Sequence, residues 1–262
     1  MGHIASHAGS QFAPLKDMKT VGSKITAVVL LITCLIPVQA TPSPLPMGPA
    51  SKTYAVFRVS YNSNNDKAIG GVAGTAFFVS GNKALTANHV LNKVSFKPSE
   101  GFELTKVFLV HEGEPAIELQ ESDVASDADV DRTIITIKSS VKPEYVYNTT
   151  SEAAVGGKVE TDGFVASSQG PIVRRFGRDL KILMVPHLVR VRLEGSLTDN
   201  RPVELHSGDV VLKAAPCYHM NYQPVVGISG GPVTYQGKVI GVNSFGDPRD
   251  RSTWAVKVPK NI

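Results

Sequence analysis

Residues 74–91 read GTAFFVSGNKALTANHVL, and this stretch places two short apolar runs on either side of one turn. The runs, 72–79 and 83–87, are rich in Val, Phe and Thr, which favour strands. Ser80, Gly81 and Asn82 between them are turn formers. The stretch therefore predicts two neighbouring strands that end in a Thr-Ala-x-His step.

The same kind of short run recurs along the rest of the chain. The other candidate strands are 54–61, 106–111, 116–120, 132–138, 158–166, 172–176, 180–194, 209–214, 231–235, 238–244 and 252–258. No long stretch has the 3.6-residue period of a helix, and Pro186 predicts two strands or a bend within 180–194. This pattern predicts an all-β protein of the sandwich or barrel type.

Composition and charge exclude several protein classes. The 262 residues are 42% hydrophobic and 19% charged, which is typical of a globular protein. The formal net charge of +4 is too small for this size to indicate nucleic-acid binding. Two cysteines, Cys34 and Cys217, exclude a disulfide-rich mini-domain and a four-cysteine zinc site. Cys217 with His219 supplies only two of the four ligands that a structural zinc needs.

The N-terminus has the features of a targeting segment. Residues 25–38, ITAVVLLITCLIPV, are uncharged and apolar, three lysines precede them, and Val38-Gln39-Ala40 provides small residues for a signal peptidase. The run is short for a bilayer span. We expect a secretory signal over 1–40 that is cleaved after Ala40, with an uncleaved membrane anchor as the alternative. Four prolines in 41–51 predict an extended tether.

One glycine-rich motif contains a candidate nucleophile. Residues 227–232 read GISGGP, with Ser229 at the centre. Serine becomes an effective nucleophile when a base takes its proton and when hydrogen-bond donors are positioned to stabilise the oxyanion that forms. The flanking glycines permit a tight turn that can aim the N–H groups of Gly227 and Ser229 at one point, as an oxyanion hole would require. An ordinary glycine-rich hairpin turn is the alternative.

Two further motifs could complete a catalytic group. His89 follows a strand, and the ordinary pKa of histidine suits proton transfer at neutral pH. Asp131 opens the Ile-rich run 132–138 and, if buried, could orient the His89 ring. A lone histidine after a strand is more often structural or solvated, and Asp127 and Asp129 compete for the carboxylate role.

The three motifs, in the order His, Asp, Ser, resemble those of the trypsin-like (chymotrypsin-fold) serine peptidases, most closely their disulfide-free bacterial and viral branch. GTAFFVSGNKALTANHVL is similar to the strand, turn and histidine block of that branch. DRTIITIK is similar to its strand after the aspartate, and GISGGPV followed by GKVIGVNSFG to its nucleophile loop and the strand behind it. The residue before the nucleophile departs from the family, which often has Asp or Asn where this chain has Ile228.

The resemblance implies two antiparallel six-stranded β-barrels, over 52–145 and 146–262, with the active site in the cleft between them. It implies that Ser229 attacks the scissile carbonyl, that His89 is the general base and that Asp131 orients His89. Backbone N–H groups of Gly227 and Ser229 would hold the oxyanion. The segment Asn243-Ser244-Phe245-Gly246 would pair with the substrate backbone, and the loop 217–224 would shape the specificity pocket.

The implied function is a secreted, periplasmic or surface-tethered serine endopeptidase that acts on a protein or peptide. Acyl-enzyme chemistry needs no metal and no organic cofactor. We expect no nucleic-acid partner, and membrane contact only through an uncleaved N-terminal segment. Residues 210–228 contain no Asp or Glu, which favours a neutral substrate side chain. The alternatives are a catalytically inactive homologue that serves as a binding module and a membrane-anchored viral polyprotein protease.

Overall fold

The computed structural model describes residues 53–62, 67–138, 143, 145–165, 172–176, 179–184, 188–207, 210–259 and 262. The chain divides into two compact units, Met1–Ala40 and Thr41–Ile262, and every described residue belongs to the second. The expected signal segment 1–40 and tether 41–51 lie outside the described residues. None of the helices within the described ranges is long and apolar enough to span a bilayer.

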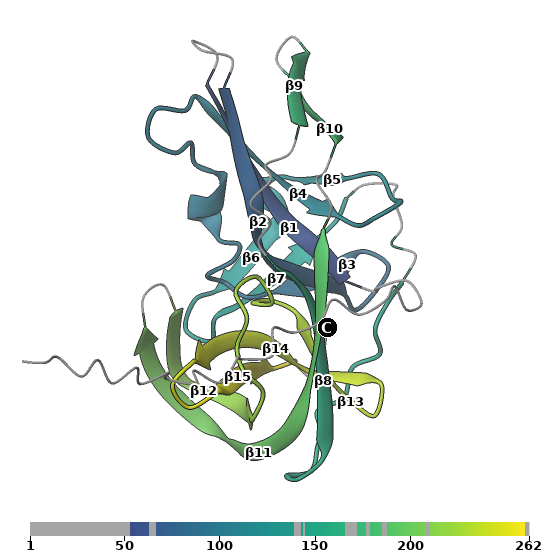
Figure 1. Ribbon diagram of the computed structural model, residues 1–262, viewed down its shortest axis with the longest axis vertical. Helices are drawn as coiled ribbons and strands as arrows, with labels where there is room; N and C mark the ends of the chain where they lie inside the picture. The colour runs from purple at the N-terminus through teal and green to yellow at the C-terminus, as the bar shows by residue number, and fades with distance from the viewer. Residues whose placement is uncertain are drawn as a thin grey trace, which may run out of the picture. The chain divides into compact units, whose positions relative to one another are not determined.

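Strands and two short 3₁₀ helices make up the regular structure of the described residues (Figure 1). In chain order they are β1 (Thr53–Asn62), β2 (Lys67–Phe78), β3 (Lys83–Thr86), η1 (Lys93–Phe96), β4 (Leu104–Val110), β5 (Ile117–Leu119), η2 (Glu121–Asp123), β6 (Val124–Asp127), β7 (Arg132–Thr136), β8 (Lys158–Val165), β9 (Ile172–Phe176), β10 (Asp179–Met184), β11 (Val189–Ser207), β12 (Val210–Met220), β13 (Pro232–Tyr235), β14 (Lys238–Asp247) and β15 (Ser252–Lys257).

The N-terminal half is one curled antiparallel sheet of seven strands in the order β5-β4-β1-β2-β3-β7-β6. Its long central strands β1 and β2 pair along their length, with a bulge between Val56 and Phe57 that bends the pair. Aromatic and aliphatic side chains such as Tyr54, Phe77 and Leu85 fill the concave face and are almost fully buried. Burial of these side chains is the main force that holds the curled sheet together.

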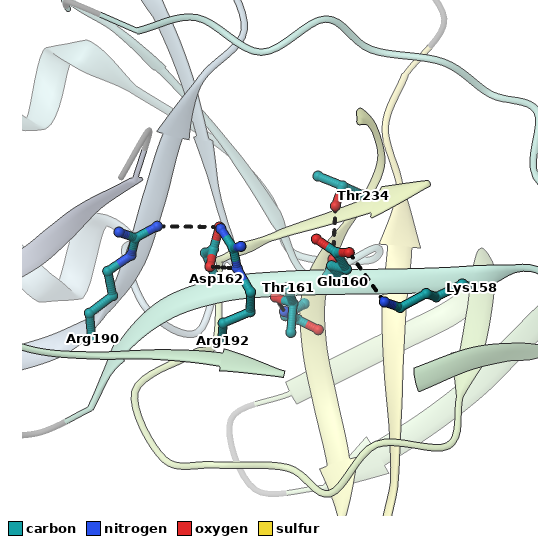
Figure 2. A network of polar contacts seen from close by, with 8 residues as sticks. Lys158, Glu160, Thr161, Asp162, Arg190, Arg192 and Thr234 are labelled. Atoms are coloured by element: carbon teal, nitrogen blue, oxygen red, sulfur yellow. Dashed lines mark hydrogen bonds and ion pairs between the residues drawn. The ribbon is translucent and has the colours of Figure 1, made fainter. Parts of the chain in front are cut away.

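The C-terminal half is a closed barrel with the strand order β11-β12-β15-β14-β13-β8 (Figure 1). Strand β8 shows the alternation that builds it. Thr161 is 1% exposed and faces the interior, whereas its neighbours Glu160 and Asp162 face outward (Figure 2). On that outer face Arg192 donates two hydrogen bonds to the Asp162 carboxylate, at 2.8 and 3.1 Å. Both faces of β8 are thus used, one for the barrel interior and one for the surface ion pair.

The expected all-β, two-barrel architecture is confirmed, with differences in detail. The first half contains seven strands rather than six, because the polar run Val124–Asp127 pairs with β7 as an additional edge strand. The segment 180–194 divides as Pro186 predicted, into β10 and β11, although Pro186 itself lies outside the described residues.

The largest error of the sequence-based prediction concerns β11 and β12. β11 continues to Ser207 and β12 to Met220, so residues 217–220 belong to a strand and not to the expected loop. The residues after 194 are mostly polar and lack the apolar alternation by which strands were predicted. An exposed part of a two-stranded ribbon does not need an apolar face, so this extension was missed. The segment that leads to the nucleophile therefore begins at Asn221.

Thr75 on β2 connects the two halves directly. Its N–H donates to the Ser229 carbonyl at 2.8 Å, and its hydroxyl donates to the Gly227 carbonyl at 2.9 Å. The same hydroxyl accepts the N–H of Phe164 on β8 at 3.0 Å. Thr75 is fully buried, so these bonds fix the glycine-rich loop of the second half against the central strand of the first.

Candidate active site

His89 and Asp131 are in direct contact. The Nδ1 atom of His89 lies 2.8 Å from Oδ2 of Asp131, and the backbone N–H of His89 donates to Oδ1 at 2.8 Å. The Asp131 side chain is 1% exposed, whereas that of His89 is 18% exposed. The carboxylate thus holds both the ring and the backbone of the histidine, and the ring keeps access to solvent.

Local backbone structure explains these positions. After β3 the chain turns, and the N–H groups of Val90 and Leu91 both donate to the Ala87 carbonyl at 3.2 Å. Leu91 is fully buried, and its carbonyl accepts the hydroxyl of Thr133 on β7. The turn that carries His89 is therefore anchored by its apolar neighbour and by the strand that follows Asp131.

Asp131 itself has an unusual backbone conformation. Its φ is +47°, in the left-handed region that Asp tolerates better than most residues but that is still uncommon. Its N–H closes a turn onto Ala128, and β7 starts at the next residue. Sparsely populated backbone conformations of this kind cluster at functional sites.

The competing carboxylates are engaged elsewhere. Asp129 pairs with Lys213 at 2.8 Å on the surface, and Asp127 pairs with Arg132 at 3.3 Å. Among these three aspartates, only Asp131 is placed against His89.

Ser244 on β14 supplies another contact to the carboxylate, because its hydroxyl donates to Oδ2 of Asp131. Its side chain is therefore turned toward Asp131 and is buried. Asn243 is also buried, and its backbone N–H and carbonyl pair with the carbonyl of Gly231 and the N–H of Gly230. The polar groups of Asn243 are thus used within the protein, and the substrate contact expected for residues 243–246 stays a prediction. Phe245 and Gly246, which are partly exposed, remain available for that role.

The residues before Ser229 form a tight turn. The N–H of Ile228 donates to the Val225 carbonyl at 3.3 Å, and Gly227 between them has φ +103°. A positive φ at the third position is typical of a type II turn and explains the glycine. The hydrogen bond of the turn uses the N–H of Ile228 and not that of Gly227. Ile228, in place of the family's common Asp or Asn, is buried in the barrel core.

The Ser229 loop lies against the segment that leads to His89. The Ser229 carbonyl accepts from Thr75, and the next residue, Gly230, is packed against Thr86 and Ala87. Within the described residues no hydrogen bond joins the Ser229 hydroxyl to the His89 ring. Catalytic hydrogen bonds are often long in the free enzyme and shorten when substrate binds.

Gly230 provides a test of how tightly this loop is fitted. A Cβ at this position would overlap the Thr75 carbonyl oxygen and the Thr86 hydroxyl, and the φ of +82° strains any other residue. We expect Gly230→Ala to lower the free energy of unfolding by about 3 kcal/mol. The control is Gly237→Ala, where φ is +75° but no atom lies within 4 Å of a Cβ. That change should cost about 1 kcal/mol in chemical denaturation, and equal losses would contradict the tight fit.

Cys217 and His219, which were considered as a pair of metal ligands, instead pack within the barrel and against Trp254. Cys217 is fully buried, and burial raises the pKa of its thiol to about 12. His219 stacks on Trp254 with ring centroids 4.1 Å apart, and its Nδ1 contacts the Thr198 hydroxyl. In the ranges that the structure describes, no three His, Cys, Asp or Glu side chains are grouped as a metal site would require.

Sequence reasoning missed the supporting polar residues. Thr75 and Ser244 lie within the quoted motifs, but nothing in their spacing indicates that they bond the nucleophile loop and the carboxylate. Tyr222 donates to Asn243 Oδ1 at 2.6 Å from a segment that was expected to be only a loop. These contacts join residues that are far apart in the chain, so no local sequence pattern predicts them.

The chain was compared with protein-family models, with curated proteins and with solved structures. No protein-family model matches the chain, and no curated protein matches it. Among solved structures it is similar to the Rv3671c protease from M. tuberculosis in its active form, with 18% identity over 86% of this chain and 89% of that chain and a TM-score of 0.49. It is similar to Deg5, with 16% identity over 80% of this chain and 84% of that chain and a TM-score of 0.48.

The HtrA-type protease AlgW in a structure with a decapeptide gives a TM-score of 0.52 at 15% identity. The match covers 80% of this chain and 61% of that chain, so this chain corresponds to about three fifths of AlgW. These proteins have the trypsin-like, chymotrypsin-type fold. The similarity to AlgW and the strand order together assign that fold to the present chain.

Proposed function

We propose that this chain, which has the chymotrypsin-like fold, is a serine endopeptidase that cleaves peptide bonds through an acyl-enzyme. The observation that carries the proposal is the contact of His89 with the buried carboxylate of Asp131, at 2.8 Å, beside a glycine turn that presents a serine. A histidine held by a buried carboxylate is the orienting half of a nucleophilic triad. The fold supports the proposal further, because it is that of the HtrA-type proteases.

In the proposed mechanism, Ser229 Oγ attacks the scissile carbonyl carbon and His89 Nε2 takes the hydroxyl proton. Asp131 accepts the Nδ1–H bond, which holds the ring in the tautomer whose Nε2 is a base and stabilises the imidazolium that forms. The N–H groups of Gly227 and Ser229 hold the oxyanion. The C–N bond then breaks, the leaving amine takes the proton from His89, and water hydrolyses the acyl-enzyme by the same route.

The proposed substrate is an extended peptide that pairs with the end of β14. Phe245 and Gly246 are partly exposed there, directly after the serine that bonds Asp131. An added strand gives affinity through main-chain hydrogen bonds without strict sequence preference. AlgW with a decapeptide is a structure of the same fold with a peptide, which supports a peptide ligand.

Export through a cleaved signal is also part of the proposal. It rests on the apolar run 25–38 and the small residues before Thr41. N-terminal sequencing of the exported protein should give a start near Thr41. A start at Met1 or Met18 would instead favour a membrane anchor, as expected for a viral polyprotein protease that keeps this segment.

The nucleophile and base are tested with a fluorophosphonate probe and peptide mapping. We expect the wild-type protein to be labelled at Ser229 and His89→Ala to be labelled about 10²–10⁴-fold more slowly, because the general base is lost. The matched control is His219→Ala, since the His219 ring stacks on Trp254 and its Nδ1 contacts the Thr198 hydroxyl. Undiminished labelling of His89→Ala would refute the assignment of the base. A folded wild-type protein that is not labelled would favour the inactive binding module.

A further inference from the structure

Three buried polar side chains meet inside the C-terminal barrel. Tyr222, Asn243 and Thr161 are 4%, 1% and 1% exposed. The Tyr222 hydroxyl donates to Asn243 Oδ1 at 2.6 Å, and Asn243 Nδ2 donates to the Thr161 hydroxyl. The hydroxyls of Thr161 and Tyr222 also interact, which closes a ring of three. Burial raises the pKa of Tyr222, so its hydroxyl remains a proton donor.

A ring of this kind is costly unless every member is satisfied. Transfer of a hydroxyl or amide from water to an apolar interior without a hydrogen-bond partner costs about 2–7 kcal/mol. An apolar core would avoid that cost. Satisfied polar networks, by contrast, accept only one arrangement of their members and so specify geometry more narrowly than apolar packing.

Asn243 links this ring to the nucleophile loop. Its carbonyl accepts the N–H of Gly230 at 2.8 Å, and its own N–H donates to the Gly231 carbonyl at 2.9 Å. These are the two residues that follow Ser229. The residue after Asn243 is Ser244, whose hydroxyl holds Asp131. The ring anchors the Asn243 side chain and thereby its backbone, and a shift of that backbone would move two neighbours at once, the serine loop and the serine that bonds the carboxylate.

Thr161 reaches the same loop from the other side. β8 lies next to β13, where Thr161 is paired with Val233, and the Asp162 carbonyl fits closely beside Gly231. The ring thus connects β8, β14 and the segment before the nucleophile at the place where the glycine loop is held.

We propose that Tyr222, Asn243 and Thr161 form a positioning network that fixes the nucleophile loop in the orientation needed for acylation. The inference rests on the proposed serine peptidase function and deepens it. None of the three side chains touches the reacting atoms. They act through Gly230, Gly231 and Ser244.

The first test removes one hydroxyl at a time. Tyr222→Phe should slow acylation by a fluorophosphonate about tenfold and lower kcat on a peptide by a similar factor while KM is unchanged, because displacement of a reacting group affects the chemical step. The matched control is Tyr218→Phe, which removes another tyrosine hydroxyl of this barrel, one that donates to the Ser151 carbonyl at 2.9 Å. The acylation rate of each variant is measured at the same number of degrees below its own melting temperature. Equal slowing in both, or none in Tyr222→Phe, would overturn the inference.

A second pair of variants distinguishes loss of the hydrogen bond from a change in packing. Thr161→Val keeps the shape but removes the hydroxyl, and Thr161→Ser keeps the hydroxyl. We expect Thr161→Val to slow acylation about tenfold and Thr161→Ser to stay within about twofold of wild type. If both slow it equally, packing and not the hydrogen bond matters, and the inference fails.

Hydrogen exchange separates this inference from the proposed function. The amide of Gly230 is bonded to Asn243, so Tyr222→Phe should increase its exchange rate at least about tenfold relative to Tyr218→Phe. This measurement does not require activity. If the wild-type protein reacts with no probe, the peptidase proposal fails, whereas unchanged Gly230 exchange would overturn the positioning network.

Discussion

Replacing Ser229 with alanine is expected to lower peptide-bond turnover by ~10⁴–10⁶-fold while the fold is kept. The change removes only the hydroxyl. The backbone bonds that hold the loop, from Thr75 to the Ser229 carbonyl and from Gly230 to Asn243, involve no side-chain atom of Ser229. The loss should therefore appear in kcat, and thermal unfolding should be nearly unchanged.

The measurement is the rate of peptide hydrolysis together with the melting temperature. Ser122→Ala is the control, because Ser122 is an exposed serine that contacts only Lys138 among its described side-chain partners. Turnover of Ser229→Ala within tenfold of wild type would remove Ser229 from the mechanism. A large fall in melting temperature would instead show that the hydroxyl is needed for folding.

The second large effect is expected at Asp131. Asp131→Asn keeps the size but puts an N–H₂ group where His89 Nδ1 now meets an acceptor. The ring would then carry its proton on Nε2 and could not accept the serine proton. We expect kcat to fall about 10⁴-fold. The bonds from the His89 backbone and from Ser244 also converge on this carboxylate, so some loss of stability should accompany it.

Asp129→Asn is the matched control for this change. Asp129 is two residues away, lies on the surface and pairs with Lys213. A surface ion pair contributes about 0–1 kcal/mol, so activity and stability should both be nearly unchanged. If Asp129→Asn lost activity and Asp131→Asn did not, the carboxylate would have been assigned to the wrong residue.

The sequence predicted those parts of the fold that leave a local pattern. Phe77 and Leu85 lie in short apolar runs bounded by turn formers, and such runs became β2 and β3. The end of β11 left no such pattern, because its exposed residues need not alternate with apolar ones. The polar strand Val124–Asp127 was missed for the same reason, since an edge strand is stabilised by main-chain pairing with β7.

The candidate site was predictable where chemistry restricts the residue type. A serine in a glycine-rich motif, a histidine after a strand and an aspartate before one were proposed because few residues could take those places, and the structure brings the histidine and the aspartate into contact. Asn243 was interpreted as a substrate contact, but its side chain faces the barrel interior and bonds Tyr222. The direction of a strand side chain depends on register, and one residue of register separates the two faces. Register is set by partners that are distant in sequence.

The contacts of Thr75 also bear on when the protein could become active during its synthesis. The ribosome makes the half that contains His89 and Asp131 first, and the loop with Ser229 is made later. Since Thr75 bonds Gly227, Ser229 and Phe164, the reactive arrangement requires segments from both halves to be folded around one threonine. A nascent chain that stops before Ser229 would lack that arrangement, so the order of translation delays the proposed hydrolytic activity until this loop has been made.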